Sequence, residues 1–317
     1  MAYSIGIDIG GTSIKAGLVD EEYKIVRSMA LPTLSCEGKD EGEKVAACVV
    51  RLMQELCAQQ GIGLSDLRSA GAGIPGSIDI ENGIVVYANN IDLHNFPLRE
   101  MVKEKTGIAL QMANDADAAA YGEYRAGAAA GCQSCILITL GTGLGGGFIK
   151  DGKVYSGYNQ RGGEFGHTVV QVGGAPCTCG RKGCLEAYAS ATGLIRLTRE
   201  AMEREGGSLM WKLAGGELEK VDGKTAFDAM EQGDIAGKAV VDTYIRYLAC
   251  GIANFINVLH PDMICLGGGV SHSGDALLLP LRAAVALEVY GGMDERTTRL
   301  ELATLGNSAG IIGAALL

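Results

Sequence analysis

The sequence predicts an α/β fold of two lobes, built from duplicated domains, with a cleft between them. Three observations predict it: short apolar strands alternate with amphipathic helices, one strand–turn–strand pattern occurs twice, and 317 residues suffice for two domains. We place residues 1–117 in an N-terminal α/β lobe, which a C-terminal helix at residues 305–317 joins. Residues 118–304 form a larger C-terminal α/β lobe.

The first half of the chain opens with two strands around a glycine turn. Alternating apolar residues predict strands at 3–9 and 14–20, joined by Gly10-Gly11-Thr12. Apolar residues at helical spacing predict an amphipathic helix over residues 39–59. The other elements predicted in this half are strands at 70–74 and 108–113, a helix at 98–105, and a helix that follows Asn114-Asp115 and ends near Gly127.

The opening pattern recurs about 130 residues later, a period that indicates a duplicated domain. A strand at 136–140 leads into the turn Gly141-Thr142-Gly143 and a second strand at 147–151. Two unrelated glycine hairpins would give a similar pattern, but the same residue types recur in the same order, which favours duplication. The elements predicted after this repeat are helices at 190–205, 225–231, 234–259, 276–289 and 307–317, and strands at 263–266 and 299–305.

Charge and composition exclude several classes of function. The chain carries 27 basic and 37 acidic residues, a net charge of -10, and no run of basic residues. We therefore expect it to bind neither nucleic acid nor anionic lipid. Its 48 glycines occur in short clusters, which favours tight turns and close approach of the backbone to ligands over disorder.

The cysteines and the N-terminus bear on the cellular compartment. Cys48, Cys57, Cys250 and Cys265 lie in apolar runs, where we expect free thiols that behave as small hydrophobic side chains. The first apolar segment contains Asp8 and lacks a basic region, unlike a signal peptide. No apolar run approaches the roughly 20 residues of a membrane span. We expect a reduced, cytoplasmic chain.

One short segment contains a complete set of metal ligands. His167, Cys177, Cys179 and Cys184 offer one imidazole and three thiols within eighteen residues, the ligand set of a closed tetrahedral Zn2+ site. Glycines between the second and third cysteines would let the backbone turn so that Cys184 reaches the same metal. The segment is therefore predicted to bind zinc.

Two glutamates bracket the predicted zinc site. Glu164 precedes the first ligand and Glu186 follows the last. A metal would hold these two carboxylates in fixed positions. A purely structural zinc site, which is the simpler alternative, would need neither of them.

Three glycine turns that follow predicted strands could bind phosphate. They are Gly10-Gly11-Thr12, Gly141-Thr142-Gly143 and Gly267-Gly268-Gly269. Backbone N–H groups in such turns bind anionic oxygens without basic side chains, which suits an acidic protein. None of the turns matches a P-loop or a dinucleotide-binding fingerprint.

Asp115 is the candidate catalytic carboxylate. Asn114 and Asp115 stand at a predicted strand-to-helix junction, where α/β proteins place reactive groups. The helix dipole would favour the ionised form of Asp115, and an ionised carboxylate can accept the proton of a substrate hydroxyl during phosphoryl transfer. On residue types alone, a capping role for Asn114 or Asp115 explains the pair equally well, and Asp117 resembles a first-turn acid.

Together these motifs closely resemble the ROK family of sugar kinases and sugar-responsive repressors, within the actin/hexokinase superfamily. The resemblance implies an actin-like, ribonuclease H-like fold for the duplicated lobes. It spans residues 5 to 313 and rests on Ile7-Asp8-Ile9-Gly10-Gly11-Thr12-Ser13-Ile14-Lys15, Gly73-Ile74-Pro75-Gly76, Asn114-Asp115-Ala116, Gly141-Thr142-Gly143-Leu144-Gly145-Gly146-Gly147, Glu164-Phe165-Gly166-His167, the segment from Cys177 to Glu186, and Leu305-Gly306-x-x-Ala309-Gly310.

The resemblance implies phosphorylation of a hexose hydroxyl with ATP, Mg2+ and a structural Zn2+. Asp115 would be the base for the attacking hydroxyl, and Asp8 would hold Mg2+ through water. The residues implied at the sugar are Gly76, Asn90, Asn114, Asp115, Glu164, His167 and Glu186. The residues implied at the nucleotide are Gly10, Gly11, Thr12, Lys15, Thr142, Gly143, Gly268 and Gly269.

The identity of the hexose stays open at this point. Glucose, phosphorylated at its 6-hydroxyl, is the simplest substrate, while N-acetylmannosamine, fructose and allose are alternatives. The family often has an aromatic residue shortly after the sugar-binding asparagine, but here the stretch is Asn89-Asn90-Ile91-Asp92-Leu93. Either asparagine could therefore face the sugar, and we assign Asn90.

A sugar sensor is the alternative from another class of function. The repressors of the family add an N-terminal helix-turn-helix, whereas this chain starts with the first predicted strand and is acidic. The retained Asp115 and the glycine turns favour catalysis over a silent sensor. Because the family often forms dimers, we also expect a homodimer.

Overall fold

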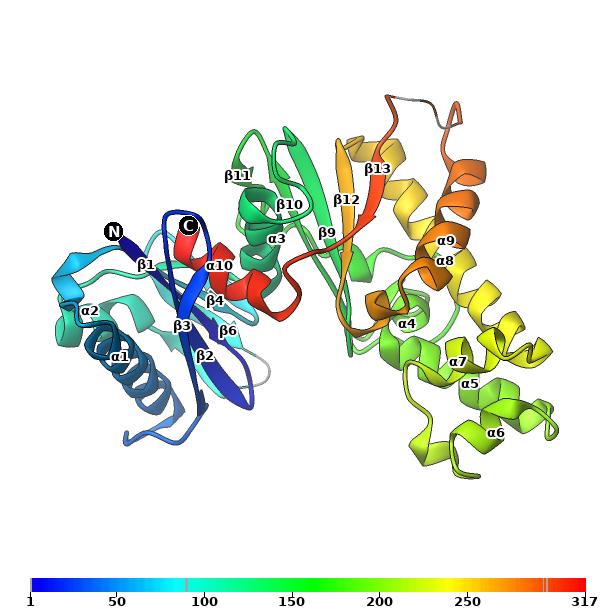
Figure 1. The fold of residues 1–317 in the computed structure, drawn as a ribbon, viewed down its shortest axis with the longest axis horizontal. Coiled ribbons are helices and arrows are strands. Elements are labelled where there is room, and N and C mark those ends of the chain that lie inside the picture. The colour runs from blue at the N-terminus through cyan, green and yellow to red at the C-terminus, as the bar shows by residue number, and fades with distance from the viewer. Residues whose placement is uncertain (1, 89–90, 293, 295) are drawn as a thin grey trace. The chain divides into compact units, whose positions relative to one another are not determined.

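Within residues 2–88, 91–292, 294 and 296–317, which the computed structural model describes, two five-stranded sheets share one strand order (Figure 1). The first sheet consists of β1 (Tyr3–Ile9), β2 (Ser13–Val19), β3 (Ile25–Pro32), β4 (Leu67–Ile74) and β8 (Gln111–Asn114), in the order β3-β2-β1-β4-β8. The second consists of β9 (Ser134–Leu140), β10 (Leu144–Lys150), β11 (Lys153–Val154), β12 (Met263–Gly267) and β13 (Arg299–Leu302), in the order β11-β10-β9-β12-β13. Each sheet therefore orders its strands as third, second, first, fourth and fifth along the chain. This shared order supports the duplication that the two glycine turns predict.

The pairing of the first sheet determines where its functional residues lie. β1 and β2 form an antiparallel hairpin in which Asp8 is opposite Lys15. β1 pairs in parallel with β4, and β4 pairs in parallel with β8. The carboxyl ends of these three parallel strands therefore share one edge of the sheet, which is where α/β proteins bind ligands.

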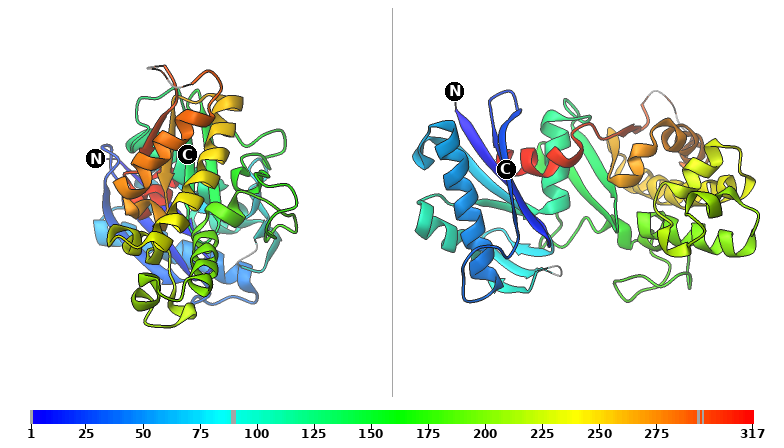
Figure 2. Two further views of the ribbon diagram at one scale, coloured as in Figure 1. Left: turned by 90° about the vertical axis from the view of Figure 1, so that its right-hand side faces the viewer. Right: turned by 60° about the horizontal axis from the view of Figure 1, so that its bottom comes forward.

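Helices cover both faces of the first sheet (Figure 2). α1 (Glu41–Gln60) packs on β2 and β3, and α2 (Leu98–Thr106) packs beside it. α3 (Asp115–Ala126) and α10 (Ala309–Leu316) pack on each other, and both contact β4. Asp40 caps the start of α1, where its carboxylate accepts a hydrogen bond from the Glu43 N–H at 2.8 Å, and Gly61 caps its end in the left-handed conformation.

A small antiparallel sheet accompanies the first five-stranded sheet. It consists of β5 (Ser77–Asp79), β6 (Ile84–Ala88) and β7 (Leu93–Phe96), in the order β5-β6-β7. Ile78, Val85 and Leu93 from these strands belong to the same buried core as β1 and α1.

The remaining helices gather around α8 (Ile235–Leu259) in the C-terminal half. They are α4 (Glu186–Ala189), α5 (Ala191–Arg204), α6 (Leu209–Leu213), α7 (Thr225–Glu231) and α9 (Asp275–Glu288). α8 packs against α4, α5, α7 and α9 and buries residues such as Val241, Tyr244 and Leu248, so much of its apolar surface belongs to the core. Among the described residues, none of the helices combines the length and apolar character needed to cross a bilayer.

The chain divides into two compact units. The first contains residues 1–137, 147–163 and 304–317, and the second contains residues 138–146 and 164–303. The lobe boundary predicted after residue 117 is not tested by this division and stays a prediction.

Most predicted elements are present, with shifts at their ends. The predicted strand at 108–113 begins only at Gln111, because pairing with β4 starts where Gly71 faces that residue. The predicted strand at 299–305 ends at Leu302. β3 and the sheet of β5, β6 and β7 were not predicted from the sequence. β3 is an edge strand with many exposed residues, so it lacks the regular apolar alternation of a half-buried strand.

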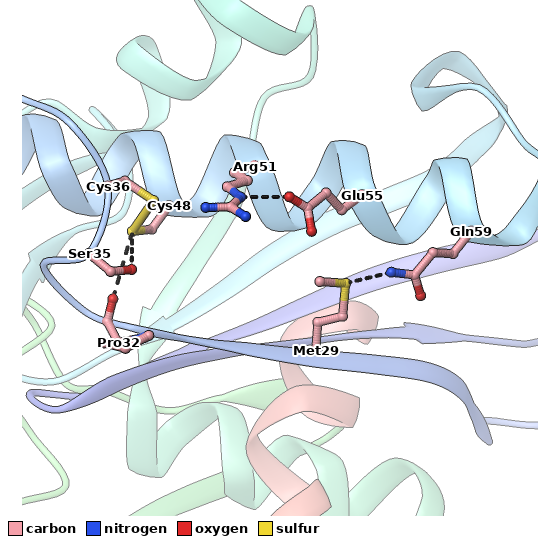
Figure 3. A network of polar contacts seen from close by, with 8 residues as sticks. All are labelled: Met29, Pro32, Ser35, Cys36, Cys48, Arg51, Glu55 and Gln59. Carbon is pink, nitrogen blue, oxygen red and sulfur yellow. Dashed lines mark hydrogen bonds and ion pairs between the residues drawn. A yellow bond between two sulfur atoms is a disulfide. The ribbon is translucent and has the colours of Figure 1, made fainter.

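A disulfide corrects one prediction about the cysteines. Cys36, in the segment after β3, is bonded to Cys48 on α1, with a Cα–Cα distance of 5.4 Å (Figure 3). The prediction of a free thiol at Cys48, and with it that of a fully reduced chain, is therefore wrong for this structure. Cys48 is buried as expected, but the unpredicted strand β3 brings Cys36 beside it. Cys57 and Cys250 are free thiols, as predicted.

Candidate functional site

Two carboxylates lie at the edge where the parallel strands of the first sheet end. Asp8 is near the end of β1 and faces Gly73 of β4, and Asp115 begins α3 directly after β8. Burial raises the pKa of Asp8, Lys15 across the hairpin lowers it, and the negative charge of Asp115 raises it further. The structure therefore brings together the two acids that the sequence analysis proposed for metal binding and proton transfer.

Asn114 caps α3 and links it to a neighbouring loop. Its Oδ1 accepts a hydrogen bond from the Ala116 N–H at 2.9 Å, and its Nδ2 donates to the Gly76 carbonyl at 3.1 Å. Asp115 Oδ1 accepts from the same Ala116 N–H at 2.9 Å. The capping interpretation is thus correct for Asn114, which also holds Gly76 beside Asp115.

Desolvation controls the protonation of Asp115. Although solvent reaches its side chain, the surrounding protein atoms desolvate the carboxylate and raise its pKa. The Ala116 N–H acts in the opposite direction but more weakly. The helix N-terminus thus favours the ionised form, as predicted, but desolvation, which the sequence did not indicate, is the larger influence. A raised pKa makes the ionised carboxylate a better proton acceptor.

The first glycine turn is held through its carbonyl groups. The Gly10 N–H donates to the Ser13 carbonyl at 3.0 Å, which closes the turn. Thr33, just after β3, donates its Oγ1–H to the Gly10 carbonyl at 2.6 Å and its N–H to the Thr12 carbonyl at 3.1 Å. Gly11 and Thr12 are exposed. Thr33 was not among the predicted site residues, because its contact with the turn depends on β3, which the sequence pattern does not predict.

The second glycine turn is held in a similar way. The Gly141 N–H donates to the Gly143 carbonyl at 3.1 Å. At the start of α5, the Ala191 N–H donates to the Gly141 carbonyl at 2.8 Å, and Thr192 Oγ1 donates to the Thr142 carbonyl at 2.7 Å. Both duplicated turns follow a strand, and in both the carbonyl of the first glycine and one further carbonyl accept hydrogen bonds from outside the hairpin. The hydroxyl and N–H donors are exchanged between the two turns.

The third glycine turn requires glycine at one position. Gly268 follows β12 with a φ of 84°, and a Cβ there would lie 2.6 Å from the backbone of Leu140. The Gly268 carbonyl accepts hydrogen bonds from the Ser271 N–H and hydroxyl, at 3.2 and 2.7 Å. Gly269 begins the short 3₁₀ turn that follows.

The predicted metal ligands lie together. One ligand atom each from His167, Cys177, Cys179 and Cys184 falls within 4.8 Å of the others. Cys179 and Cys184 Sγ are 3.7 Å apart, and Cys177 Sγ is 3.6 Å from His167 Nδ1. A tetrahedron with Zn–S bonds of ~2.3 Å has edges of about 3.8 Å, so the spacing fits a zinc ion.

The loop is shaped for this convergence. Gly183 has a φ of 82°, and a Cβ there would lie 1.7 Å from the Gln171 carbonyl oxygen. Burial raises the pKa of the Cys177 thiol to about 12, whereas a metal binds the thiolate. The four residues therefore form a possible metal site, as the sequence predicts.

The two bracketing glutamates have different surroundings. Glu186, the first residue of α4, accepts hydrogen bonds from the Thr178 hydroxyl at 3.0 Å through Oε1 and from the Leu144 N–H at 3.0 Å through Oε2. It thus joins the metal loop to the residue after the second glycine turn. Glu164 is exposed and precedes the short turn that carries His167.

The candidate residues fall into two groups, one in each compact unit. The first unit contains Asp8, Gly10, Gly11, Thr12, Lys15, Gly76, Asn114 and Asp115. The second contains Thr142, Gly143, Glu164, His167, Cys177, Cys179, Cys184, Glu186, Gly268 and Gly269. Asn89 and Asn90 lie outside the described residues. The ligand assigned to each residue stays a prediction.

Comparison with known proteins agrees with the motifs. The model of the ROK family matches residues 4–317. The chain is 39% identical over 312 residues to a glucokinase of Thermotoga maritima, which covers 98% of this chain and 95% of the relative. A glucokinase of Halalkalibacterium halodurans is 38% identical and covers 98% of this chain and 92% of its own. A crystal structure of a ROK family glucokinase from Streptomyces griseus, in complex with glucose and AMPPNP, superposes with a TM-score of 0.80 at 34% identity and covers 99% of this chain and 98% of that one. The chain belongs to the ROK family.

Proposed function

We propose that this chain is an ATP-dependent hexose kinase that transfers the γ-phosphoryl group of ATP to the 6-hydroxyl of glucose. The observation that carries the proposal is Asp115, a partly desolvated carboxylate at the carboxyl edge of a parallel sheet, in a chain that is 39% identical over 98% of its length to a glucokinase. Such a carboxylate is suited to accept the proton of an attacking hydroxyl.

In this mechanism Asp115 is the general base. Its ionised carboxylate accepts the proton of the 6-hydroxyl as that oxygen attacks the γ-phosphorus, and ADP leaves with the electrons of the broken P–O bond. Asn114 keeps α3 and Gly76 in a fixed arrangement beside Asp115. We propose that the sugar hydroxyls are bound by Gly76, Asn90, Asn114, Glu164, His167 and Glu186.

The nucleotide is assigned to the glycine turns. N–H groups of Gly11, Thr12, Thr142 and Gly143 would bind phosphate oxygens, while Gly10 closes the first turn through its bond to Ser13. Lys15 would add a positive charge, and Gly268 and Gly269 would lie against the adenosine. Asp8 would hold Mg2+ through water, since Mg2+ prefers oxygen ligands and retains much of its hydration shell. When bound, Mg2+ neutralises the phosphate charge that develops during transfer.

A zinc ion is assigned to the loop of His167, Cys177, Cys179 and Cys184. It would supply no reacting group, because three thiolates and an imidazole complete its tetrahedral shell. Its proposed contribution is to fix the loop that leads from His167 to Glu186. The hydrogen bonds that Glu186 accepts from Thr178 and Leu144 support this contribution.

The test is a coupled ADP-release assay with Mg-ATP and a panel of glucose, mannose, fructose, N-acetylglucosamine and N-acetylmannosamine. We expect the highest kcat/KM with glucose. Higher turnover of N-acetylmannosamine or fructose would support a sugar kinase whose preferred substrate is that sugar and not glucose. No sugar-dependent ADP release, together with sugar-induced thermal stabilisation, would reject the kinase in favour of a sugar sensor.

The proposal also includes a cytoplasmic homodimer without nucleic acid or membrane partners. The net charge of -10 supports the absence of polyanionic partners. Sedimentation equilibrium would measure the oligomeric state, and a monomer at micromolar concentration would reject the dimer.

A further inference from the structure

Both duplicated glycine turns accept hydrogen bonds from outside their hairpins, and none of the roles assigned above explains these bonds. In each turn, two carbonyl groups accept hydrogen bonds from a segment outside the hairpin, one from a threonine hydroxyl and one from a backbone N–H. Thr33 provides both donors for the first turn. Thr192 and Ala191 provide them for the second.

A hydrogen bond to a backbone carbonyl also fixes the direction of the N–H group of the following residue. The C=O of one residue and the N–H of the following residue belong to the same planar trans peptide and point in opposite directions. Fixing the Gly10 carbonyl on Thr33 therefore directs the Gly11 N–H away from Thr33, and fixing the Thr12 carbonyl does the same for the Ser13 N–H. The Thr33 hydroxyl and N–H donate only to carbonyl groups of the turn. These hydrogen bonds therefore use none of the turn's N–H groups, which are the groups that would bind an anion.

The first support is buried and anchored, whereas the second is open to solvent. Thr33 is 2% exposed, so water does not replace its hydroxyl bond readily. The segment that follows it is held by the Ser35 N–H, which donates to the Pro32 carbonyl at 3.1 Å, and by the disulfide from Cys36 to α1 (Figure 3). Thr192 is exposed at the start of α5.

We propose that Thr33 is a positioning residue for phosphate binding: it presets the directions of the Gly11 and Ser13 N–H groups in the first glycine turn, and Thr192 has the same but weaker role for the Gly143 N–H at the second turn. The inference rests on the proposed function, because it assumes that these turns bind the phosphates of ATP. It predicts that losing the Thr33 hydroxyl weakens nucleotide binding and leaves sugar binding unchanged. A residue that only stabilised the fold would affect both ligands.

The experiment compares Thr33→Val, which removes the hydroxyl at nearly constant shape, with Thr33→Ser, which retains it. Calorimetry measures the Kd of Mg-ADP, and steady-state kinetics measure KM for Mg-ATP and for glucose. For the loss of one buried hydrogen bond we expect Thr33→Val to raise the Kd of Mg-ADP and the KM for Mg-ATP roughly five- to tenfold. Thr33→Ser should stay within about twofold of the wild type, and Thr192→Val should weaken binding about twofold, because water competes for its exposed bond.

The matched control is Thr106→Val. The Thr106 hydroxyl donates to the Val102 carbonyl at 2.8 Å and accepts from the Ile108 N–H at 3.1 Å at the end of α2, so this variant loses at least as much hydroxyl bonding away from the glycine turns. Its Kd for Mg-ADP should equal that of the wild type. The proposal is overturned if Thr33→Val keeps the wild-type Kd, if Thr33→Ser is as weak as Thr33→Val, or if KM for glucose rises in the same proportion.

Two further comparisons cover the cases in which Thr33→Val does not fold or the wild type phosphorylates no sugar. If Thr33→Val does not fold, Thr33→Ala against Thr33→Ser replaces it, and equal Mg-ADP affinity of these two variants overturns the proposal. If the wild type phosphorylates no sugar, the proposed function fails, while the Mg-ADP affinities still decide the role of Thr33. If the wild type is an active kinase and Thr33→Val binds Mg-ADP normally, only the role of Thr33 fails.

Discussion

The edge of the first sheet and the cysteine loop position their functional groups by different means. Asp8 and Asp115 are placed by strand pairing, because β1, β4 and β8 run in parallel and end at one edge. The loop from His167 to Cys184 has little regular structure and depends on four side chains that converge within 4.8 Å. We therefore expect Asp8 and Asp115 to keep their positions without a metal. The loop from His167 to Cys184 should lose its arrangement when no metal is bound.

The largest expected effect tests the first region. Asp115→Asn removes the proposed base but keeps the oxygen that accepts the Ala116 N–H. We expect kcat to fall by roughly 10²- to 10⁴-fold, the usual contribution of a positioned base, with the Kd for glucose nearly unchanged. Steady-state kinetics and calorimetry measure the two quantities.

Asp228→Asn is the matched control for this variant. Asp228 is an exposed carboxylate in the first turn of another helix, α7, so its loss tests the effect of removing a helix N-terminal charge. Its kcat should equal that of the wild type. If Asp115→Asn turned over glucose as fast as this control, Asp115 would lose its assigned role.

The next effect tests the second region. Cys179→Ser removes one of the four converging ligands, and we expect it to release zinc and to weaken glucose binding by roughly 10- to 100-fold, the range seen when groups that support a metal site are lost. Atomic absorption measures the bound zinc and calorimetry measures the Kd for glucose. The circular dichroism of the first sheet and its helices should be retained.

Cys250→Ser controls for the loss of a thiol, because Cys250 lies on α8 and outside the four-ligand cluster. It should keep both zinc and glucose affinity. Loss of zinc from Cys179→Ser with unchanged glucose affinity would show that the metal does not organise the residues around Glu186, and the contrast between the two regions would then have no functional consequence.

The same contrast explains what could be predicted from sequence. The metal ligands are close in the chain, so their spacing alone predicts their convergence, and the apolar alternation of β1 predicts the strand that carries Asp8. Thr33 could not be found in this way, because its role depends on the edge strand β3, whose exposed residues give no clear periodic signal. Cys36 was missed as a disulfide partner for the same reason. The raised pKa of Asp115 depends on the protein atoms packed around it, which no local pattern reports.

The smallest effect concerns pH and sharpens the assignment of Asp115. Catalysis needs its ionised form, so kcat/KM should fall as the pH is lowered through the pKa of Asp115. Because burial raises that pKa, the midpoint of this acidic limb should lie above the ordinary aspartate value of 3.8. A pH–rate profile measures the midpoint, and a value at or below 3.8 would contradict desolvation as the dominant influence.

The raised pKa of Asp115, which favours proton transfer, lowers the stability of the fold when the carboxylate is ionised. A fold that favours the protonated carboxyl gains stability from it below pH 3.8, and this gain is lost as the pH rises through the higher pKa of the folded state. At neutral pH the ionised Asp115 is therefore a cost to the fold, and Asp115→Asn should have a slightly higher Tm than the wild type at pH 7. Thermal unfolding at pH 7 measures the difference. A lower Tm for the variant would mean that the charge of Asp115 stabilises the edge of the sheet, and proton transfer would then have to rely on a carboxylate of ordinary basicity.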